Sequence, residues 1–150
     1  LRPQVLDEIG FAAAIAEYAR EVSLRTGIPI AVTMADLETI RLSPNVETAL
    51  FRIAQEALTN AIRHGEPHRI SIAATLIGKS VNLTISDDGH GFDVEQVFQC
   101  RTDSDRPFGI ICIHERAGLL GGRAQIVSQR EQGTSVIVRI PLNTPASAHA

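Results

Sequence analysis

The chain has 150 residues, of which 44% are apolar, so it can bury a core without disulfide or metal staples. Its 14 basic and 17 acidic residues give a net charge of -3, with one Tyr and no Trp. Nucleic-acid-binding surfaces are usually basic and carry stacking aromatics, so no nucleic-acid partner is expected. No apolar run approaches the roughly 20 residues of a membrane span, and nothing resembles a signal peptide. Direct membrane contact by this domain is therefore not expected.

Three segments with helical periodicity alternate with shorter strand-like runs. The first helix is predicted from about Gly10 to Ser23, and the second from Pro44 to about Arg63. The third is predicted from about Ile110 to Leu120, where two glycines close it. Each ends at glycine or proline, as helices in globular domains commonly do.

Five runs have the alternation of polar and apolar residues that is typical of strands: Ile30–Thr33, Ile70–Leu76, Val81–Ile85, Ala124–Ser128 and Ser135–Ile140. The last four form two predicted hairpins. Alternating strands indicate a sheet with one face open to water. The sequence thus predicts an α/β fold, a two-layer sandwich with a mixed sheet of about five strands and three helices on one face. The domain is expected to span residues 1–142, followed by a disordered tail over 143–150.

The first segment whose side chains could bind a ligand or take part in a reaction is RIAQEALTNAIRH, on the predicted second helix. At 100° per residue, Glu56, Asn60, Arg63 and His64 fall within an arc of roughly 100°. Asn offers a neutral oxygen to a hard cation such as Mg²⁺, and Arg can neutralise phosphate charge. A plain solvated helix face is the alternative explanation of the same pattern.

The second segment, SDDGHGFD, follows a predicted strand directly. Asp87 can accept a hydrogen bond from an exocyclic amine, which would favour adenine over guanine. Gly89 and Gly91 let the backbone approach a ligand closely. An ordinary acidic turn is the alternative, because Asp and Gly dominate turns.

The third segment, FGIICIHERAGLLGG, opens the last predicted helix. Gly109 lies where free backbone N–H groups and the helix dipole favour an anion, although it could merely end a loop. The polar stretch before it, from Asp93 to Pro107, carries Arg101 and Arg106. Its composition is that expected of a mobile lid.

In this order the three segments resemble the N box and the two glycine boxes of the catalytic domain of sensor histidine kinases. That domain belongs to an ATPase superfamily (the Bergerat fold) shared with DNA gyrase, a heat-shock chaperone and mismatch-repair proteins. The opening LRPQVLDEIGFAAAI resembles the domain entry of nitrate-sensor-like kinases, and GTSVIVRIP resembles the family's last strand. The resemblance covers residues 1–142.

The resemblance implies ATP and Mg²⁺ as cofactors and assigns roles to particular positions. Asn60 would bind the Mg²⁺ that bridges the phosphates, and Glu56 would be the general base. The nucleotide would be held by Asn60, Arg63, His64, Asp87, Gly89, Gly91, Gly109 and Thr134, the last assisting Asp87 through water.

The resemblance also implies partners. The phosphoacceptor histidine would lie on upstream dimerisation helices of the same protein, and a response regulator would receive the phosphate. Because the first residue is Leu1 rather than Met, the chain is expected to be a fragment. Because those upstream helices are not in the sequence, it is expected to bind ATP but not to autophosphorylate alone. Cys100 and Cys112 lack metal-ligand spacing and are expected to be reduced thiols in the cytoplasm. The full-length protein could still be membrane-anchored.

Two other functions share these motifs. An anti-sigma-factor-type serine kinase uses the same fold, although the LRP entry and the ERAGLLGG helix fit histidine kinases better. The second alternative is a degenerate, non-catalytic interaction domain. Its support is Cys112, which replaces the usual glycine and could restrict the lid. Metal binding by His64 and His68 is disfavoured, because Pro67 interrupts the helix between them.

Overall fold

A five-stranded mixed sheet forms one layer of the domain. The computed structural model describes residues 2–95 and 108–142. The strands are β1 (Ile30–Thr33), β2 (Ile70–Ile77), β3 (Ser80–Asp87), β4 (Arg123–Gln129) and β5 (Gly133–Pro141). Their order is β1-β2-β3-β5-β4, in which β1 runs parallel to β2 and all other neighbours are antiparallel. All five predicted strands and both predicted hairpins are confirmed.

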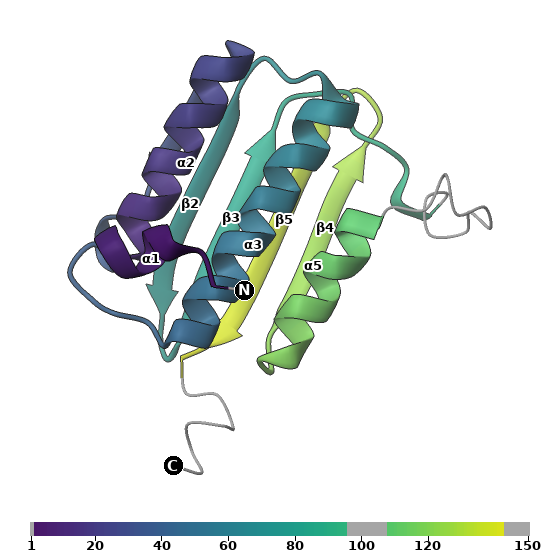
Figure 1. Cartoon of the computed structure of the whole chain (residues 1–150). Coiled ribbons are helices and arrows are strands. Elements are labelled where there is room, and N and C mark those ends of the chain that lie inside the picture. Colours follow the sequence, from purple (N-terminus) through teal and green to yellow (C-terminus); the bar gives the residue numbers. More distant parts are fainter. Residues whose placement is uncertain (1, 96–107, 143–150) are drawn as a thin grey trace.

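In residues 2–95 and 108–142, the four α-helices with given bounds cover one face of this sheet (Figure 1). They are α1 (Gln4–Ile9), α2 (Phe11–Thr26), α3 (Pro44–Asn60) and α5 (Phe108–Leu119), and a short 3-10 helix, η1 (Ala35–Leu37), follows β1. The predicted α/β sandwich is confirmed. The prediction of three helices omitted α1, because Leu6 and Ile9 continue the apolar spacing of the next helix.

Gly10 separates α1 from α2. Its backbone has a φ of 84°, a conformation that L side chains rarely adopt, so neither helix can pass through it. Leu6 in α1 is fully buried, which shows that this short helix belongs to the core.

The helix that carries the first motif begins as predicted but ends differently. The Ser43 hydroxyl accepts a hydrogen bond from the Val46 N–H (3.4 Å), and Pro44 occupies the first turn. Regular α-helix stops at Asn60, and residues Ala61–Gly65 form a π-helical turn, η2. The prediction of α-helix through about Arg63 was therefore too long. Because a π turn has a wider hydrogen-bonded loop, the arc calculated at 100° per residue does not hold beyond Asn60.

One continuous core lies between the helices and the sheet. Its largest fully buried apolar side chains come from helices and strands alike: Leu6, Ile15, Leu50, Ile53, Leu58, Ile70, Ile72, Leu83, Ile113 and Ile140. On the opposite face, side chains such as Ser71, Gln125 and Arg139 are exposed. The sheet thus has the water-facing side that its alternating strands predict.

A buried carboxylate ties the start of the chain to the start of α3. Glu47 is only 1% exposed, and its Oε1 accepts hydrogen bonds from Arg2 Nη2 (2.9 Å) and Arg41 Nη2 (3.4 Å). Arg2 also donates to the Pro44 carbonyl (2.8 Å) and to Thr48 Oγ1 (3.0 Å). The segment before α1 is therefore fixed to the first turns of α3.

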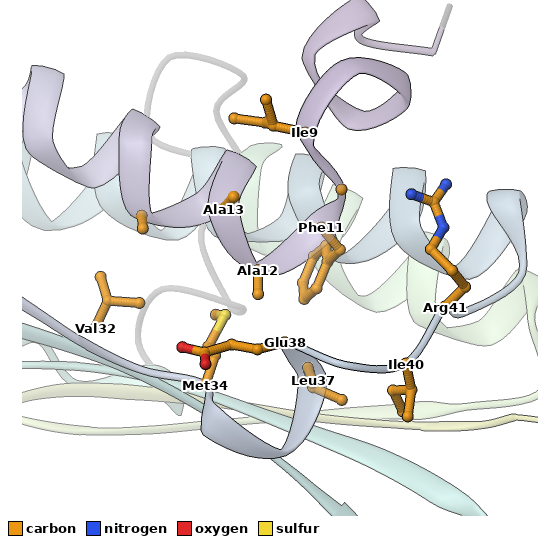
Figure 2. A pocket seen from close by; sticks show the side chains of 12 residues that line it. Ile9, Phe11, Ala12, Ala13, Val32, Met34, Leu37, Glu38, Ile40 and Arg41 are labelled. Carbon is orange, nitrogen blue, oxygen red and sulfur yellow. The ribbon is translucent and has the colours of Figure 1, made fainter.

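A hollow of about 370 Å³ lies between the α1–α2 junction and the segment after β1 (Figure 2). Ile9, Phe11, Met34 and Leu37 are among its apolar lining residues. It contains none of the predicted nucleotide-binding or catalytic residues, so it is separate from the candidate site. Within residues 2–95 and 108–142, no helix combines the length and apolar character of a membrane span.

Candidate functional site

The three motifs meet at one end of the domain. β3 ends at Asp87, and its partner in register is Thr134, next to the first residue of β5. At the same end α3 gives way to its π turn, and α5 begins in the opposite direction beside it (Figure 1). This is the end of the sheet at which a ligand could contact all three motifs.

Asp87 presents a partly buried carboxylate at this end. Its Oδ1 accepts a hydrogen bond from the Gly89 N–H at 2.9 Å. Burial raises the pKa of the Asp87 carboxyl, while hydrogen bonds from the backbone of Gly89 and Thr134 oppose that effect. A carboxylate fixed in this way suits recognition of a ligand N–H group.

The end of the α3 segment contacts the first glycine motif directly. A Cβ built on Gly65 would lie 3.6 Å from Asp87 Oδ1. A Cβ on Gly89 would collide with the Gly65 carbonyl oxygen, and the His90 N–H donates to that same oxygen at 2.7 Å. Gly89 is thus required for close approach of two backbones, and this contact joins the first two motifs.

The turn between β4 and β5 supports the first glycine motif from the other side. Gly91 has a φ of 63°, and a Cβ there would collide with the Gln129 carbonyl oxygen. Ser128 Oγ accepts a hydrogen bond from the Phe92 N–H (2.8 Å) and lies 2.7 Å from Thr134 Oγ1. The Thr134 hydroxyl is therefore oriented by Ser128 beside the strand end that carries Asp87.

Gly109 brings the third motif against α3. A Cβ built on it would lie 2.7 Å from Asn60 Nδ2, 2.9 Å from Asn60 Oδ1 and 2.7 Å from Glu56 Oε2. Real Cβ atoms essentially never come this close to other heavy atoms. Glycine at the start of α5 therefore allows the Asn60 amide and the Glu56 carboxylate to lie next to its backbone.

The same contact bears on the fit of a magnesium ion. Asn60 and Glu56 place amide and carboxylate oxygens around one point, and these are ligand types that Mg²⁺ accepts. Among the residues that the structure describes, no group of three or more His, Cys, Asp or Glu could form a metal cage. Mg²⁺ commonly uses one or two protein oxygens with waters and substrate phosphates, so the residues present fit that kind of site.

Arg63 and His64 lie on the π turn, and both are exposed. The structure therefore forms two groups of predicted site residues. Glu56 and Asn60 lie beside Gly109, and Gly89 and Thr134 lie beside Asp87 at the strand end. Gly65 lies between the two groups. The predicted lid residues Arg101 and Arg106, Cys100, and the predicted tail 143–150 lie outside the described residues. Cys112 is a partly exposed free cysteine on α5.

Sequence reasoning missed several residues that hold this end together. Gly65 is not among the predicted site residues, although its carbonyl and its missing side chain both contact the first glycine motif. Asp88 accepts hydrogen bonds from the N–H groups of His68 (2.7 Å) and Arg69 (3.0 Å), and these lower the pKa of its carboxyl. The presence of Pro67 two residues after Gly65 was an available signal, whereas the pairing of Asp88 with residues 19 and 20 positions away was not.

The class of protein to which this fold belongs follows from comparison with known families. The chain matches the family described as histidine kinase-, DNA gyrase B- and HSP90-like ATPases over residues 45–144, and it belongs to that family. Within it, ATP-binding domains of sensor histidine kinases are a kind that the chain resembles, as its relatives indicate.

Curated relatives include named histidine kinases. The chain is 33% identical to the signal transduction histidine-protein kinase/phosphatase DegS of Bacillus subtilis over 145 residues, covering 95% of this chain and 37% of the relative. It is 33% identical over 146 residues to an uncharacterized sensor-like histidine kinase of Chloroflexus aurantiacus, covering 96% of the chain and 24% of the relative. The sensor histidine kinase LiaS of Bacillus subtilis is 31% identical over 142 residues, 95% of the chain and 37% of LiaS. The chain thus spans well under half the length of these proteins.

Solved structures share the fold. The histidine kinase domain of the blue-light activated kinase EL346 from Erythrobacter litoralis superposes with a TM-score of 0.71 at 19% identity, covering 89% of this chain and 61% of that chain. Full-length ShkA, solved in complex with AMPPNP, gives a TM-score of 0.69 at 21% identity, covering 88% of this chain and 29% of ShkA. These likenesses establish the common architecture.

Proposed function

We propose that the chain is the ATP-binding catalytic domain of a sensor histidine kinase, which transfers the γ-phosphoryl group of ATP to a histidine on helices of the same protein. The observation that carries this proposal is the double contact at one end of the domain. Gly109 adjoins Asn60 and Glu56, and Gly65 adjoins Asp87. A nucleotide with its base at Asp87 and its phosphates toward Asn60 would span these two points.

The proposed binding roles follow from the chemistry of each group. The Asp87 carboxylate accepts a hydrogen bond from the adenine amine, with Thr134 assisting it through water. Asn60 holds Mg²⁺, which neutralises phosphate charge. Arg63 reaches the phosphates from the π turn, and His64 lies beside the nucleotide. Gly89, Gly91 and Gly109 keep side chains out of the space the nucleotide needs.

Glu56 is the proposed general base. As a nitrogen of the acceptor imidazole bonds to the γ-phosphorus and the bond to the β-phosphate oxygen breaks, Glu56 takes the proton from the ring's other nitrogen, and ADP leaves. Phosphoryl transfer depends chiefly on positioning and charge stabilisation. The contact of Glu56 with the backbone of Gly109 supports this role, because it restricts where the carboxylate can lie.

The remaining proposals concern the whole protein. Its partners are the upstream dimerisation helices and a response regulator, as the named histidine kinases among its relatives suggest. The opening LRPQVLDEIG supports placement with nitrate-sensor-like kinases. A cytoplasmic location is proposed, because ATP is available there.

The test is phosphoryl transfer from labelled ATP, with histidine-bearing dimerisation helices supplied to the chain. Glu56→Gln should slow transfer about 100-fold or more while changing nucleotide affinity little, as expected of a group that acts in the transition state. Equal losses of transfer and binding would argue for a binding role instead. An anti-anti-sigma protein offered as a second acceptor distinguishes the histidine kinase from the serine kinase alternative. Phosphorylation of that protein, but not of the histidine-bearing helices, would contradict a histidine kinase.

A further inference from the structure

The open face of the sheet is the side turned away from α1, α2, α3 and α5 (Figure 1). Many of its side chains are short or carry a hydroxyl group: Ser71, Ala73, Thr75, Ser80, Thr84, Ser86 and Ser135. Among the strand residues on this face in the described part of the chain, the charged ones are two arginines, Arg123 and Arg139. Surfaces that face only water commonly carry interspersed charges of both signs. This face is therefore positive, although the chain has a net charge of -3.

The two arginines occupy directly opposite positions on neighbouring strands, Arg123 on β4 and Arg139 on β5. Cβ atoms of such a pair lie about 4.5–5.5 Å apart, and like charges there are destabilising. A Cβ built on Gly122 would collide with the Arg139 carbonyl oxygen, so glycine allows the start of β4 to lie against β5 at this level. Both arginines are exposed, and none of the ion pairs within residues 2–95 and 108–142 includes either of them. The fold thus places two positive charges side by side without a carboxylate partner from these residues.

The arginine pair continues across the sheet as a row of hydrogen-bond donors. Asn82 on β3 is the partner of Arg139 in register, and Thr75 on β2 is the partner of Asn82. We call these four residues the donor row: Thr75, Asn82, Arg139 and Arg123. Because neighbouring strands are about 4.8 Å apart, the row is roughly 14 Å long. Guanidinium groups bind carboxylates through two parallel hydrogen bonds, so carboxylates on a partner are the chemical complement of this row.

The rest of the face favours a polypeptide over a nucleic acid as this partner. Ile77 and Val127 on the same face are 46% and 47% exposed, and Ile137 is partly exposed between them and the donor row. Such apolar side chains are suited to contact with another protein. Nucleic-acid surfaces neutralise several phosphates and commonly use stacking aromatics. The face offers two positive charges, and the five strands contain no aromatic residue.

We propose that the open face of the sheet binds an acidic segment of a partner polypeptide, with a carboxylate between Arg123 and Arg139 and further contacts along the donor row. The bound carboxylate offsets the repulsion between the two guanidinium groups. Successive side chains of a strand point to opposite faces, so Asp87 and Thr134 lie on the helix-covered side. The surface is therefore distinct from the proposed nucleotide site, and binding to it does not require ATP.

The test is an NMR titration of the isotope-labelled chain with two extended peptides of nine residues. One carries Glu at three alternate positions between Thr residues, so that its carboxylates share one face of an extended chain. The other carries Gln at those positions. The acidic peptide should bind about tenfold more tightly. Its largest shift changes should lie at Asn82, Arg123 and Arg139.

Arg123→Gln combined with Arg139→Gln should remove this preference and leave ATP affinity unchanged. It should not lower the free energy of unfolding, because it removes a like-charge pair. The matched control is Arg20→Gln with Arg25→Gln, which removes two positive charges from exposed positions on α2 and should keep the preference. If the first double variant does not fold, Arg123→Gln alone, on the outermost strand, should reduce the preference partially.

Equal affinity for the two peptides, no binding of either, or a preference that survives in the folded arginine variants would overturn the proposal. A double variant that folds but is clearly less stable would also contradict it, because the arginines would then have a structural role. Sodium acetate at the same carboxylate concentration must not produce the same shifts, since that result would indicate a free-anion site. A short DNA strand that binds the donor row more tightly than the acidic peptide would point to a nucleic-acid surface instead.

Discussion

Position 109 illustrates how a single missing side chain can organise a site. The atoms nearest to the place of its absent Cβ belong to the two polar side chains of α3 that the first motif singles out. The sequence identified Gly109, Asn60 and Glu56 as candidates, each from its own motif. Their contact could not be predicted, because it depends on how α5 packs against α3.

Gly109→Ala should weaken binding of ATP with Mg²⁺ by about tenfold or more, since the new methyl group forces Asn60 and Glu56 to move. Isothermal titration calorimetry measures this change. Gly118→Ala in the same helix is the control, because nothing lies within 4 Å of its Cβ position. That variant should bind normally and be more stable by up to about 1 kcal/mol. Equal affinities of the two variants would contradict the assigned role of Gly109.

Asp88 makes a pH-dependent contribution at the same strand end. Hydrogen bonds from the backbone of Arg69 and His68 lower the pKa of its carboxyl in the folded state. The stabilisation by the Asp88 carboxylate is therefore complete at pH values above the unfolded-state pKa of about 3.9. It is lost as the pH falls through the lower folded-state pKa.

Asp88→Asn should accordingly be less stable than the unmodified chain at pH 7, and the difference should shrink below about pH 4. Urea unfolding at a series of pH values measures it. Asp36→Asn, which removes an equal charge from another exposed position, serves as the comparison. A difference that stays constant down to pH 2 or so would argue against the ionised hydrogen bonds.

At the scale of elements, local patterns were sufficient for the strands and insufficient for helix ends. Both hairpins were predictable because alternation repeats every two residues whatever the strand packs against. The short helix α1 was missed because Leu6 and Ile9 continue the apolar spacing of α2. The π turn was missed because a rotation of 100° per residue assumes regular α-helix, and nothing in AIRHG signals a wider turn.

The ion pair between Arg2 and Glu47 is a second feature that could not be predicted from local sequence patterns. Arg2→Met should destabilise the domain by roughly 1–3 kcal/mol, because it leaves a buried carboxylate with only the longer contact to Arg41. Arg20→Met is the control. It breaks an exposed pair with Glu17, which solvent screens, and should cost much less stability than Arg2→Met. Chemical denaturation measures the free energy of unfolding of both variants. Equal losses of stability would contradict the role of the buried pair in fixing the start of the chain to α3.

At the scale of the molecule, the residues that form the core and those that form the proposed site lie in different parts of the fold. The core is continuous beneath all four helices, while the polar residues of the three motifs lie at one end of the sheet. The segment from Arg2 is fixed at the opposite end of α3 from Asn60. The start of the chain and the proposed site therefore contact opposite ends of one helix.

The central claim is that Asp87 and Asn60 belong to one site shaped for ATP and its magnesium ion. Calorimetric titration of the chain with ATP and GTP in the presence of Mg²⁺ tests it most directly. ATP should bind roughly 10–100-fold more tightly than GTP, because guanine presents a carbonyl where adenine donates an amine hydrogen to Asp87, and Asp87→Asn should greatly weaken ATP binding without unfolding the domain. Equal affinity for the two nucleotides, undiminished ATP binding by the folded Asp87→Asn variant, or no binding of ATP would contradict the account.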